Sequence, residues 1–396
     1  MFLMKLRTLI TINVFWLIGI VYTNYFFLQP ETVDGDCNPP RVELFKDFFT
    51  QYEAVKAVNI PPEYFYAKKI NVFNPYFPPV AMLYRPFTIF PYKTAAFIFF
   101  LINISAYLYT VEILRRNFLK DNIILYSAAL LFPPALNTIF IGNNNIIILL
   151  ALTLLCFNKK NSRMLNAFLL TAAIIIKIYS FILLLYYLSK KKYKDFIYVL
   201  ICITIFAAVS ILVINPENYS IYFKQISPNY KNAWIVKNLG NHSFLSLSHK
   251  LFGNTIDETI PIVYYPGIIF PLTYLISFIF LASTFILTLK NNNNSDNLNL
   301  YIVTMLLTFG VTWNHTFALL IMPLIYCYYL LTNNSYSGRL KLLFYISFLL
   351  IALDFNKDNL KTGYQLLLTC PKLYGTIILY FIYARIFTLA NKKNTI

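Results

Sequence analysis

The feature that most constrains this fold is a series of long apolar segments separated by short loops rich in lysine and arginine. The first segment, after Lys5 and Arg7, reads "LITINVFWLIGIVYTNYFF" (residues 9–27), and comparable segments recur to the C-terminus. A helix needs about 20 apolar residues to cross a bilayer. Hydrophobic residues make up 58% of the chain and charged residues 12%, whereas soluble domains carry roughly 25% charge. The pattern predicts an all-α polytopic membrane protein.

Placing the basic loops inside the cell orients the segments and gives about twelve transmembrane helices. The predicted spans are residues 8–27, 94–113, 122–139, 146–157, 164–189 (two short segments), 196–214, 264–289, 299–312, 317–331, 342–354 and 364–387. The first is expected to stay uncleaved, because no small-residue cleavage site follows it. Residues 1–396 then form a single membrane domain with two long outer loops, residues 28–93 and 215–262, that carry interfacial helices.

Lys177 lies at the centre of the apolar segment 164–189, which has basic clusters at both ends. A single span would place one cluster outside, whereas a hairpin that turns at Lys177 keeps both inside. A lysine at the centre of a lipid-facing helix costs about 2.5–3.5 kcal/mol on insertion scales. We therefore expect the hairpin. Ionisable groups in the membrane are functional candidates, although Lys177 could also extend its amine to the interface.

The first long loop contains an amphipathic segment, residues 42–58. Apolar side chains recur there at three- and four-residue spacing, and they are Phe45, Phe48, Phe49, Tyr52 and Val55. This spacing is typical of a helix, which we expect to lie on the membrane with its aromatic side chains in lipid. Asp47 falls on the opposite side and would face water or a cleft. The proline-rich segment 74–93 is expected to be bent and to lie at the interface.

Polar candidates occur at the same predicted outer face. The chain has three histidines, and two stand in similar settings, Asn241-His242-Ser243 and Asn314-His315-Thr316. A histidine can contact phosphate or move protons, or it can simply form a local hydrogen bond at the interface. The "GNNN" turn (142–145) supplies amides that can bind hydroxyls or phosphates, but asparagine also favours turns.

Several classes of function lack a signal. No phosphate-binding loop of the Walker type, HExxH motif, GxSxG motif or cluster of zinc ligands occurs. The net charge of +17 follows the positive-inside pattern, and no basic stripe with interleaved aromatics indicates nucleic-acid binding. A membrane enzyme, a transporter or flippase of a lipid-linked sugar, and a non-catalytic membrane subunit remain open.

Five segments in order carry a resemblance to a known family. They are "KDFFTQYEAVKAV" followed by "FNPYFPPVAMLYRPFTIFP", "FIGNNNIIILLAL", "LLTAAIIIKIYSFILLLYYLSKKKYKDF", "NLGNHSF" and "VTWNHTFALLIMPL". Together they resemble GT-C superfamily membrane glycosyltransferases, in particular the polyprenol-phosphate-mannose-dependent α-mannosyltransferase family (glycosyltransferase family 87). The similarity covers residues 40–330. One departure is Asn143, where the family usually has glutamine.

The resemblance implies a GT-C-like helical bundle in the bacterial inner membrane that transfers a sugar on the outer face. The donor would be a sugar, most often mannose, on a polyprenyl phosphate, the acceptor a membrane lipid or glycan, and no other cofactor or metal is implied. Asp47 matches the catalytic aspartate, and His315 and Lys177 match contacts to the donor phosphate. Sugar or acceptor contacts would come from Tyr76, Asn143, Asn145, Asn241 and His242.

Residue chemistry agrees with inverting transfer. That reaction needs one base to deprotonate the acceptor hydroxyl and a group that stabilises the departing phosphate. A retaining enzyme more often uses a second carboxylate as nucleophile. Asp47 with histidine or lysine nearby is the minimum set for inversion.

Overall fold

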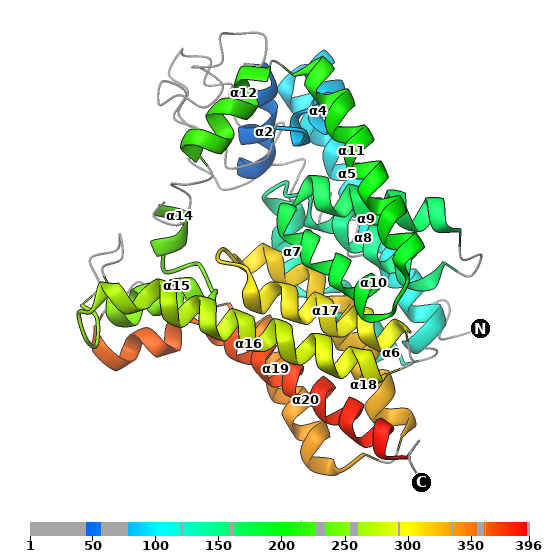
Figure 1. Cartoon of the computed structure of the whole chain (residues 1–396), viewed down its shortest axis with the longest axis vertical. Coiled ribbons are helices and arrows are strands. Elements are labelled where there is room, and N and C mark those ends of the chain that lie inside the picture. Colours follow the sequence, from blue (N-terminus) through cyan, green and yellow to red (C-terminus); the bar gives the residue numbers. More distant parts are fainter. Residues whose placement is uncertain are drawn as a thin grey trace.

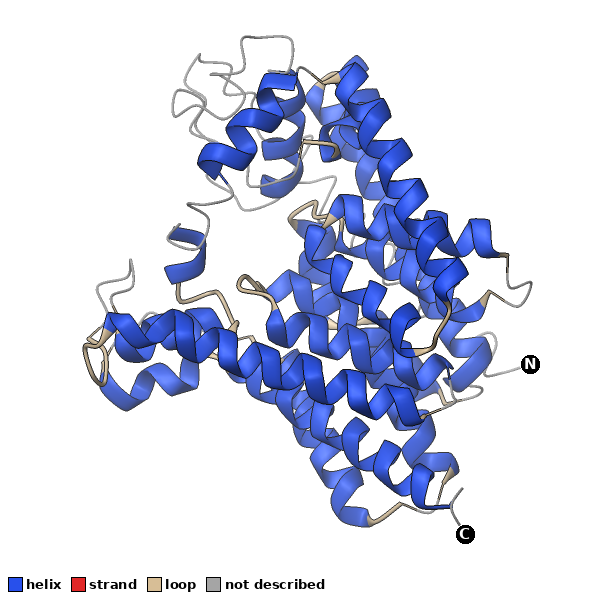
Figure 2. Ribbon diagram, viewed as in Figure 1, coloured by secondary structure: helices blue, strands red, loops and turns tan. Residues whose placement is uncertain are grey.

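The computed structural model describes eleven parts of the chain. They are residues 45–56, 78–119, 122–158, 162–214, 216–226, 234–253, 260–291, 294–334, 336–354, 360 and 362–393. The predicted first span (8–27), the start of the first outer loop and Tyr76 lie outside these residues. Within them every regular element is a helix, apart from one parallel β-bridge between Ile260 and Thr362 (Figure 2). The prediction of an all-α fold is confirmed.

The helices are labelled in chain order in Figure 1, with the short 3-10 and π segments labelled η. The first half comprises α2 (Lys46–Lys56), α4 (Val80–Tyr84), η2 (Arg85–Ile89), α5 (Tyr92–Leu114), η3 (Arg115–Leu119), α6 (Ile123–Leu130), α7 (Pro133–Phe140), α8 (Asn145–Phe157), α9 (Arg163–Ile176), η4 (Ile178–Leu183), α10 (Leu184–Ser189) and α11 (Tyr193–Val213). The second half comprises α12 (Pro216–Ile221), η5 (Tyr222–Ile226), α14 (Trp234–Lys237), α15 (Phe244–Phe252), η7 (Pro266–Ile268), α16 (Ile269–Lys290), α17 (Asn294–Thr308), η8 (Asn314–Leu320), α18 (Ile321–Asn333), α19 (Gly338–Ala352), η9 (Gly363–Thr369) and α20 (Pro371–Lys393).

Six of the described helical segments are long and apolar enough to cross a membrane. They are Tyr92–Leu119, Ile123–Phe140, Tyr193–Val213, Pro266–Lys290, Asn314–Asn333 and Pro371–Leu389. Four shorter apolar helices, Asn145–Phe157, Arg163–Ile176, Ile178–Ser189 and Asn297–Thr308, lie among them in the sequence. The chain is therefore a polytopic membrane protein. The total of about twelve spans stays a prediction.

Prolines interrupt one predicted span and shift the start of another. The predicted span 122–139 consists of α6 and α7, which are separated at Leu131 and Phe132 just before Pro133 and Pro134. The predicted span 364–387 is wrong at its start, because residues Gly363–Thr369 form η9 and α20 begins only at Pro371. Proline lacks the N–H that a helix interior needs and is tolerated in the first turn. Each proline thus begins a new helix.

The predicted hairpin at Lys177 agrees with the structure. Nε of Arg163, the first residue of α9, lies 3.5 Å from Oδ1 of Asp195 in the first turn of α11. The chain therefore leaves one end of the bundle in α9, turns at Lys177, and returns to the same end through η4 and α10 before α11 begins. Short helices suit this path, because neither arm has to cross the full bilayer.

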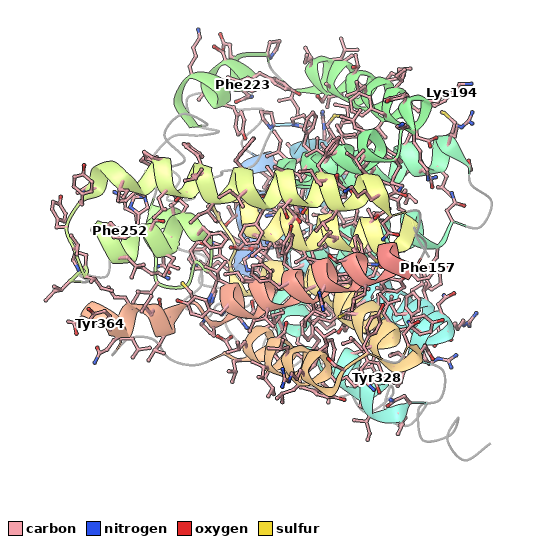
Figure 3. All side chains as sticks on the ribbon, turned by 60° about the horizontal axis from the view of Figure 1, so that its bottom comes forward. Phe157, Lys194, Phe223, Phe252, Tyr328 and Tyr364 are labelled. Atoms are coloured by element: carbon pink, nitrogen blue, oxygen red, sulfur yellow. The ribbon has the colours of Figure 1, made fainter. Side chains whose placement is uncertain are left out.

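The basic residues at this end occupy the connections between neighbouring helices. Lys190 Nζ donates to the backbone carbonyl of Thr288, which places the C-terminal end of α16 beside the start of α11. In Figure 3, Phe157 at the end of α8 and Lys194 in α11 appear at one end of the bundle, while Phe252 and Tyr364 appear at the other. We call the end with Arg163, Lys190 and Lys194 the basic end. The polar candidates lie at the opposite end, described below.

The aromatic stripe of α2 packs on the protein and not on lipid, so the prediction of a lipid anchor is wrong. Phe45 and Phe48 are fully buried, and Tyr52 is 1% exposed. The Phe48 ring stacks on Phe99 of α5 with 4.7 Å between centroids, and the Tyr52 hydroxyl donates to the carbonyl of Phe90 at 2.7 Å. An amphipathic pattern identifies an apolar face, but lipid and a neighbouring apolar helix satisfy that face equally well.

Candidate active site

The site is built where the start of α2 meets the end of α7. Phe45 N donates to the carbonyl of Phe140 at 2.8 Å, and Asp47 N donates to that of Ile141 at 3.0 Å. The first N–H groups and the last carbonyls of a helix lack partners within it, so these two helix ends satisfy each other. Phe45 adopts the left-handed conformation with φ +58°, which is rare for a residue other than glycine. Asp47 is thereby fixed beside the turn that follows α7.

Gly142, the glycine of the "GNNN" turn, allows this close approach. It has φ +68°, and a Cβ at this position would lie 2.8 Å from Cβ of Phe48 and 2.9 Å from Cδ1 of Phe45. Glycine is the residue that reaches this backbone conformation without strain. The sequence predicted a turn at this position, and the structure shows that the turn rests directly on α2.

Asn143 orients the carboxylate of Asp47. Its Nδ2 donates to Oδ2 of Asp47 at 2.6 Å, and its Oδ1 accepts from the backbone N–H of Asn145 at 3.1 Å. The second bond determines which end of the amide faces Asp47, because only the amide nitrogen can donate to a carboxylate. The structure describes no hydrogen bond to Oδ1 of Asp47, and the side chain is 29% exposed. That oxygen is available to accept a proton.

His315 stands beside the same carboxylate. Its Nε2 lies 3.9 Å from Oδ2 of Asp47, and its side chain is 14% exposed. This distance is longer than a hydrogen bond. The backbone carbonyl of His315 accepts from Thr138 Oγ1 at 2.8 Å and from Asn145 Nδ2 at 3.2 Å. The start of η8 is thus attached to α7 and α8, and the imidazole is held next to Asp47.

Lys177 completes the set at the break between α9 and η4. Its backbone is extended, with φ −141° and ψ 106°, and its amine lies within electrostatic range of both Asp47 and His315. Two residues later, the Tyr179 hydroxyl donates to Asn145 Oδ1 at 3.2 Å. This bond connects the hairpin tip to the "GNNN" turn. The predicted candidates Asp47, Asn143, Asn145, Lys177 and His315 therefore converge.

Tyr84 and Asn144 also belong to this region, and sequence reasoning missed both. Asn144 Nδ2 donates to the Tyr84 hydroxyl at 3.1 Å, and both side chains are buried. Burial and the negative charge of Asp47 raise the pKa of the Tyr84 hydroxyl above its ordinary value, so it remains protonated. The only sequence signal was Asn144, the second amide of the "GNNN" turn, because a tyrosine among so many others is inconspicuous.

The candidates Asn241 and His242 form a neighbouring network. Asn241 is fully buried, and its Nδ2 donates to the backbone carbonyls of Val236 and Gly310, which favours a structural role. His242 Nε2 lies 2.8 Å from Oδ1 of Asn314, and Asn314 Nδ2 donates to Oδ1 of Asp354 at 2.9 Å. Sequence analysis did not select Asp354, although it is an isolated acid at the end of a predicted span. The two Asn-His motifs are therefore adjacent.

One family model matches enough of the chain to assign its family. The model of glycosyltransferase family 87 matches residues 74–323, which is more than half of the chain. The chain belongs to glycosyltransferase family 87. It is therefore a glycosyltransferase, and this confirms the resemblance seen in the five ordered segments. A transporter or a non-catalytic subunit is no longer needed to explain the sequence.

The match to family 87 includes the "GNNN" turn, Lys177 and His315 but begins after Asp47. The assignment of Asp47 to the site therefore rests on its contacts with Asn143 and His315. The comparison with curated proteins finds no match, and neither does the comparison with solved structures. Within the described residues, no three or more histidine, cysteine, aspartate or glutamate side chains are grouped as metal ligands.

Proposed function

We propose that this family 87 enzyme transfers a sugar, mannose, from a polyprenyl phosphate to a hydroxyl of a membrane lipid or glycan, with inversion at the sugar carbon. The observation that carries the proposal is the Asp47 carboxylate, oriented by Asn143 and facing His315. One carboxylate with nitrogen groups beside it is the arrangement that inverting transfer needs. No cofactor beyond the lipid-linked donor is required for this chemistry.

The step balances with these groups alone. Oδ1 of Asp47 takes the proton of the acceptor hydroxyl, and the hydroxyl oxygen forms a bond to C1 of the sugar. The bond between C1 and the phosphate oxygen breaks on the opposite side, and its electron pair leaves with the polyprenyl phosphate. His315 and Lys177 would stabilise the charge that develops on that phosphate. Asn143 keeps the carboxylate pointed at the acceptor.

The proposal that the sugar is mannose and its carrier a polyprenyl phosphate is supported by the motifs that resemble the mannosyltransferases of family 87. A lipid-linked donor agrees with the absence of any nucleotide-binding motif from the sequence. It also agrees with a site formed where α7 ends, α8 begins and α9 ends. At such helix ends, a phosphate at the membrane surface and a prenyl chain in the bilayer can bind together. Asn145 and His242 are the described candidates for sugar or acceptor contacts, and Tyr76 is a further candidate from the sequence.

We place this reaction on the outer face of a bacterial inner membrane. The support is the separation of the site from the basic end. α8 begins at the site with Asn145 and ends at Phe157, and α9 begins after it with Arg163 at the basic end. Short basic connections favour the cytoplasmic side, so the opposite end with Asp47 would face outward. Cysteine labelling of intact cells at Lys46, an exposed residue of α2, would test this orientation.

The experiment that tests the function measures transfer of radiolabelled mannose from polyprenyl-phosphate mannose into membrane lipid or glycan. We expect Asp47→Asn to reduce transfer to background, because the amide cannot accept the proton. Glu53→Gln changes another acid of α2 in the same way and should leave transfer intact. Full activity in Asp47→Asn would overturn the assignment of the base. If the enzyme transferred sugar from another polyprenyl-phosphate sugar but not from polyprenyl-phosphate mannose, only the choice of mannose would be overturned.

A further inference from the structure

A pocket lies at the other end of α2, away from the proposed base. Its volume is about 190 Å³, and it is lined by Val55, Lys56, Ala81, Met82, Arg85, Thr88, Val213 and Ile214. These residues come from the last turn of α2, from α4 and η2, and from the end of α11. Figure 1 shows α2, α4 and one end of α11 together at the top of the molecule. Lys56 is nine residues after Asp47, or about 14 Å along the helix axis.

Both charged side chains among the described lining residues are positive. Lys56 and Arg85 are exposed, and none of the described lining residues is an acid. The nearest acidic partner is Glu53, whose carboxylate is 4.0 Å from the Lys56 amine, too far for a hydrogen bond. The same amine lies 4.5 Å above the ring of Tyr52. The structure describes no ion pair for Arg85, and Thr88 donates its hydroxyl to the Arg85 carbonyl. The two cations are therefore the groups that can recognise an anion.

Apart from Thr88, the remaining described side chains of the lining are apolar, and they continue onto the exposed apolar surface of α11. Val55 is 6% exposed, and Ile214 is 2% exposed. α11 is the most apolar of the six candidate spans, and only 11% of its apolar window is buried within the protein. On the last turns of α11, Leu212 is 86% exposed and Val209 is 44% exposed. The head of a ligand in the pocket would contact Lys56 and Arg85, and its apolar part could lie along the exposed side chains of α11.

We propose that this pocket binds the phosphate headgroup of an anionic phospholipid. Arginine pairs with phosphate through two parallel hydrogen bonds, and lysine binds phosphate as a point charge. The acyl chains would lie along the exposed side chains of α11. A soluble anion would gain nothing from the apolar walls, which is why a lipid is the occupant favoured here. The site is separate from Asp47 and does not depend on the proposed transfer reaction.

The test is native mass spectrometry of the full-length protein titrated in detergent with phosphatidylglycerol or with phosphatidylcholine. We expect tighter binding of phosphatidylglycerol by the wild-type protein. Lys56→Gln with Arg85→Gln should weaken its tightest binding event by roughly tenfold or more, since the hydrogen bonds from both cations to the charged phosphate are lost. Arg339→Gln with Lys341→Gln removes two exposed cations at the start of α19 and should leave that event unchanged. Lys56→Arg with Arg85→Lys keeps both charges and should restore it.

Three results would overturn the proposal. The first is equal affinity of the wild-type protein for the two lipids. The second is unchanged phosphatidylglycerol binding in the double glutamine variant with a wild-type melting temperature. The third is displacement of the lipid by an equal concentration of inorganic phosphate, which would make the pocket a site for a soluble anion. Sugar transfer is not the readout, so the failure of either proposal leaves the other unaffected.

Discussion

The hydrogen bond from Asn143 to Asp47 offers the sharpest test of how this site works. Substitution of Asn143 by alanine removes the 2.6 Å bond to Oδ2 and leaves Asp47 itself in place. It also removes the acceptor of the Asn145 N–H, so the turn before α8 loosens. The carboxylate then rotates among several orientations, of which only some point Oδ1 at the acceptor hydroxyl.

The size of the effect follows from the type of bond. A hydrogen bond to a charged group contributes about 1.5–3 kcal/mol, and each ~1.4 kcal/mol is a tenfold change in rate. We therefore expect kcat to fall about 10- to 150-fold in Asn143→Ala. The KM for the donor should change little, because the phosphate contacts proposed for His315 and Lys177 remain. Asp47→Asn should be lower still, at background.

The assay is transfer from polyprenyl-phosphate mannose in proteoliposomes, with kcat and KM determined separately. Asn158→Ala is the matched control, because Asn158 ends the same helix at the basic end and donates to Asn166 Oδ1. It should transfer sugar at the wild-type rate. If Asn143→Ala keeps the wild-type kcat while the protein is folded, the orientation of Asp47 does not depend on this bond, and the reasoning is refuted.

Three further predictions concern the supports of the site. Gly142→Ala should destabilise the protein by about 1–3 kcal/mol and reduce transfer. Gly338→Ala is the control, because nothing lies within 4 Å of a Cβ at that position, and it should do neither. Equal melting temperatures and transfer rates in the two variants would contradict the argument that Gly142 is needed for the close approach. Asp354→Ala removes one partner of Asn314. It should lower kcat/KM for the donor only about 2- to 12-fold, because this hydrogen bond is exposed to solvent. Asp195→Ala is the control, and an unchanged kcat/KM in Asp354→Ala would be the contrary result. Burial, helped by the charge of Lys237, lowers the pKa of His249 from 6.5 to about 4. The unfolded chain then binds more protons between these values, so stability should fall by up to about 3 kcal/mol from pH 6.5 to pH 4; His249→Gln should reduce this slope in melting experiments, and an identical slope would exclude His249 as its source.

The candidate site shows how far residue patterns reach. Lys177 was selected as a charged residue among apolar neighbours and Asp47 as an acid on the polar side of an amphipathic segment. Asn143 was selected from the "GNNN" turn and His315 from the repeated Asn-His motif. All of these signals are present in one dimension. Tyr84 and Asp354 were missed because a tyrosine or a single acid at a loop is common in this chain. Their importance arises from neighbours that are distant in sequence, such as Asn144 for Tyr84 and Asn314 for Asp354.

The aromatic stripe of α2 marks the same limit. Its spacing predicted a helix and an apolar face, and both are present. The spacing could not show whether lipid or protein covers that face, because lipid chains and apolar side chains offer Phe48 an equally apolar environment. The hairpin at Lys177 was predictable, since the cost of a charge in lipid and the two basic clusters leave few alternatives.

The sequence by itself determined that this is a membrane protein, and it determined the helices, the hairpin and the family. Hydropathy, charge and ordered motifs are local properties of the chain, so they can be read without the fold. Only the tertiary structure decided that α2 folds back onto the protein, so that Asp47 comes to the "GNNN" turn nearly a hundred residues away and to His315 beyond it. The physical reason is that these contacts depend on which helix ends meet. Two backbone hydrogen bonds from α2 to α7 and a glycine without a side chain bring them together.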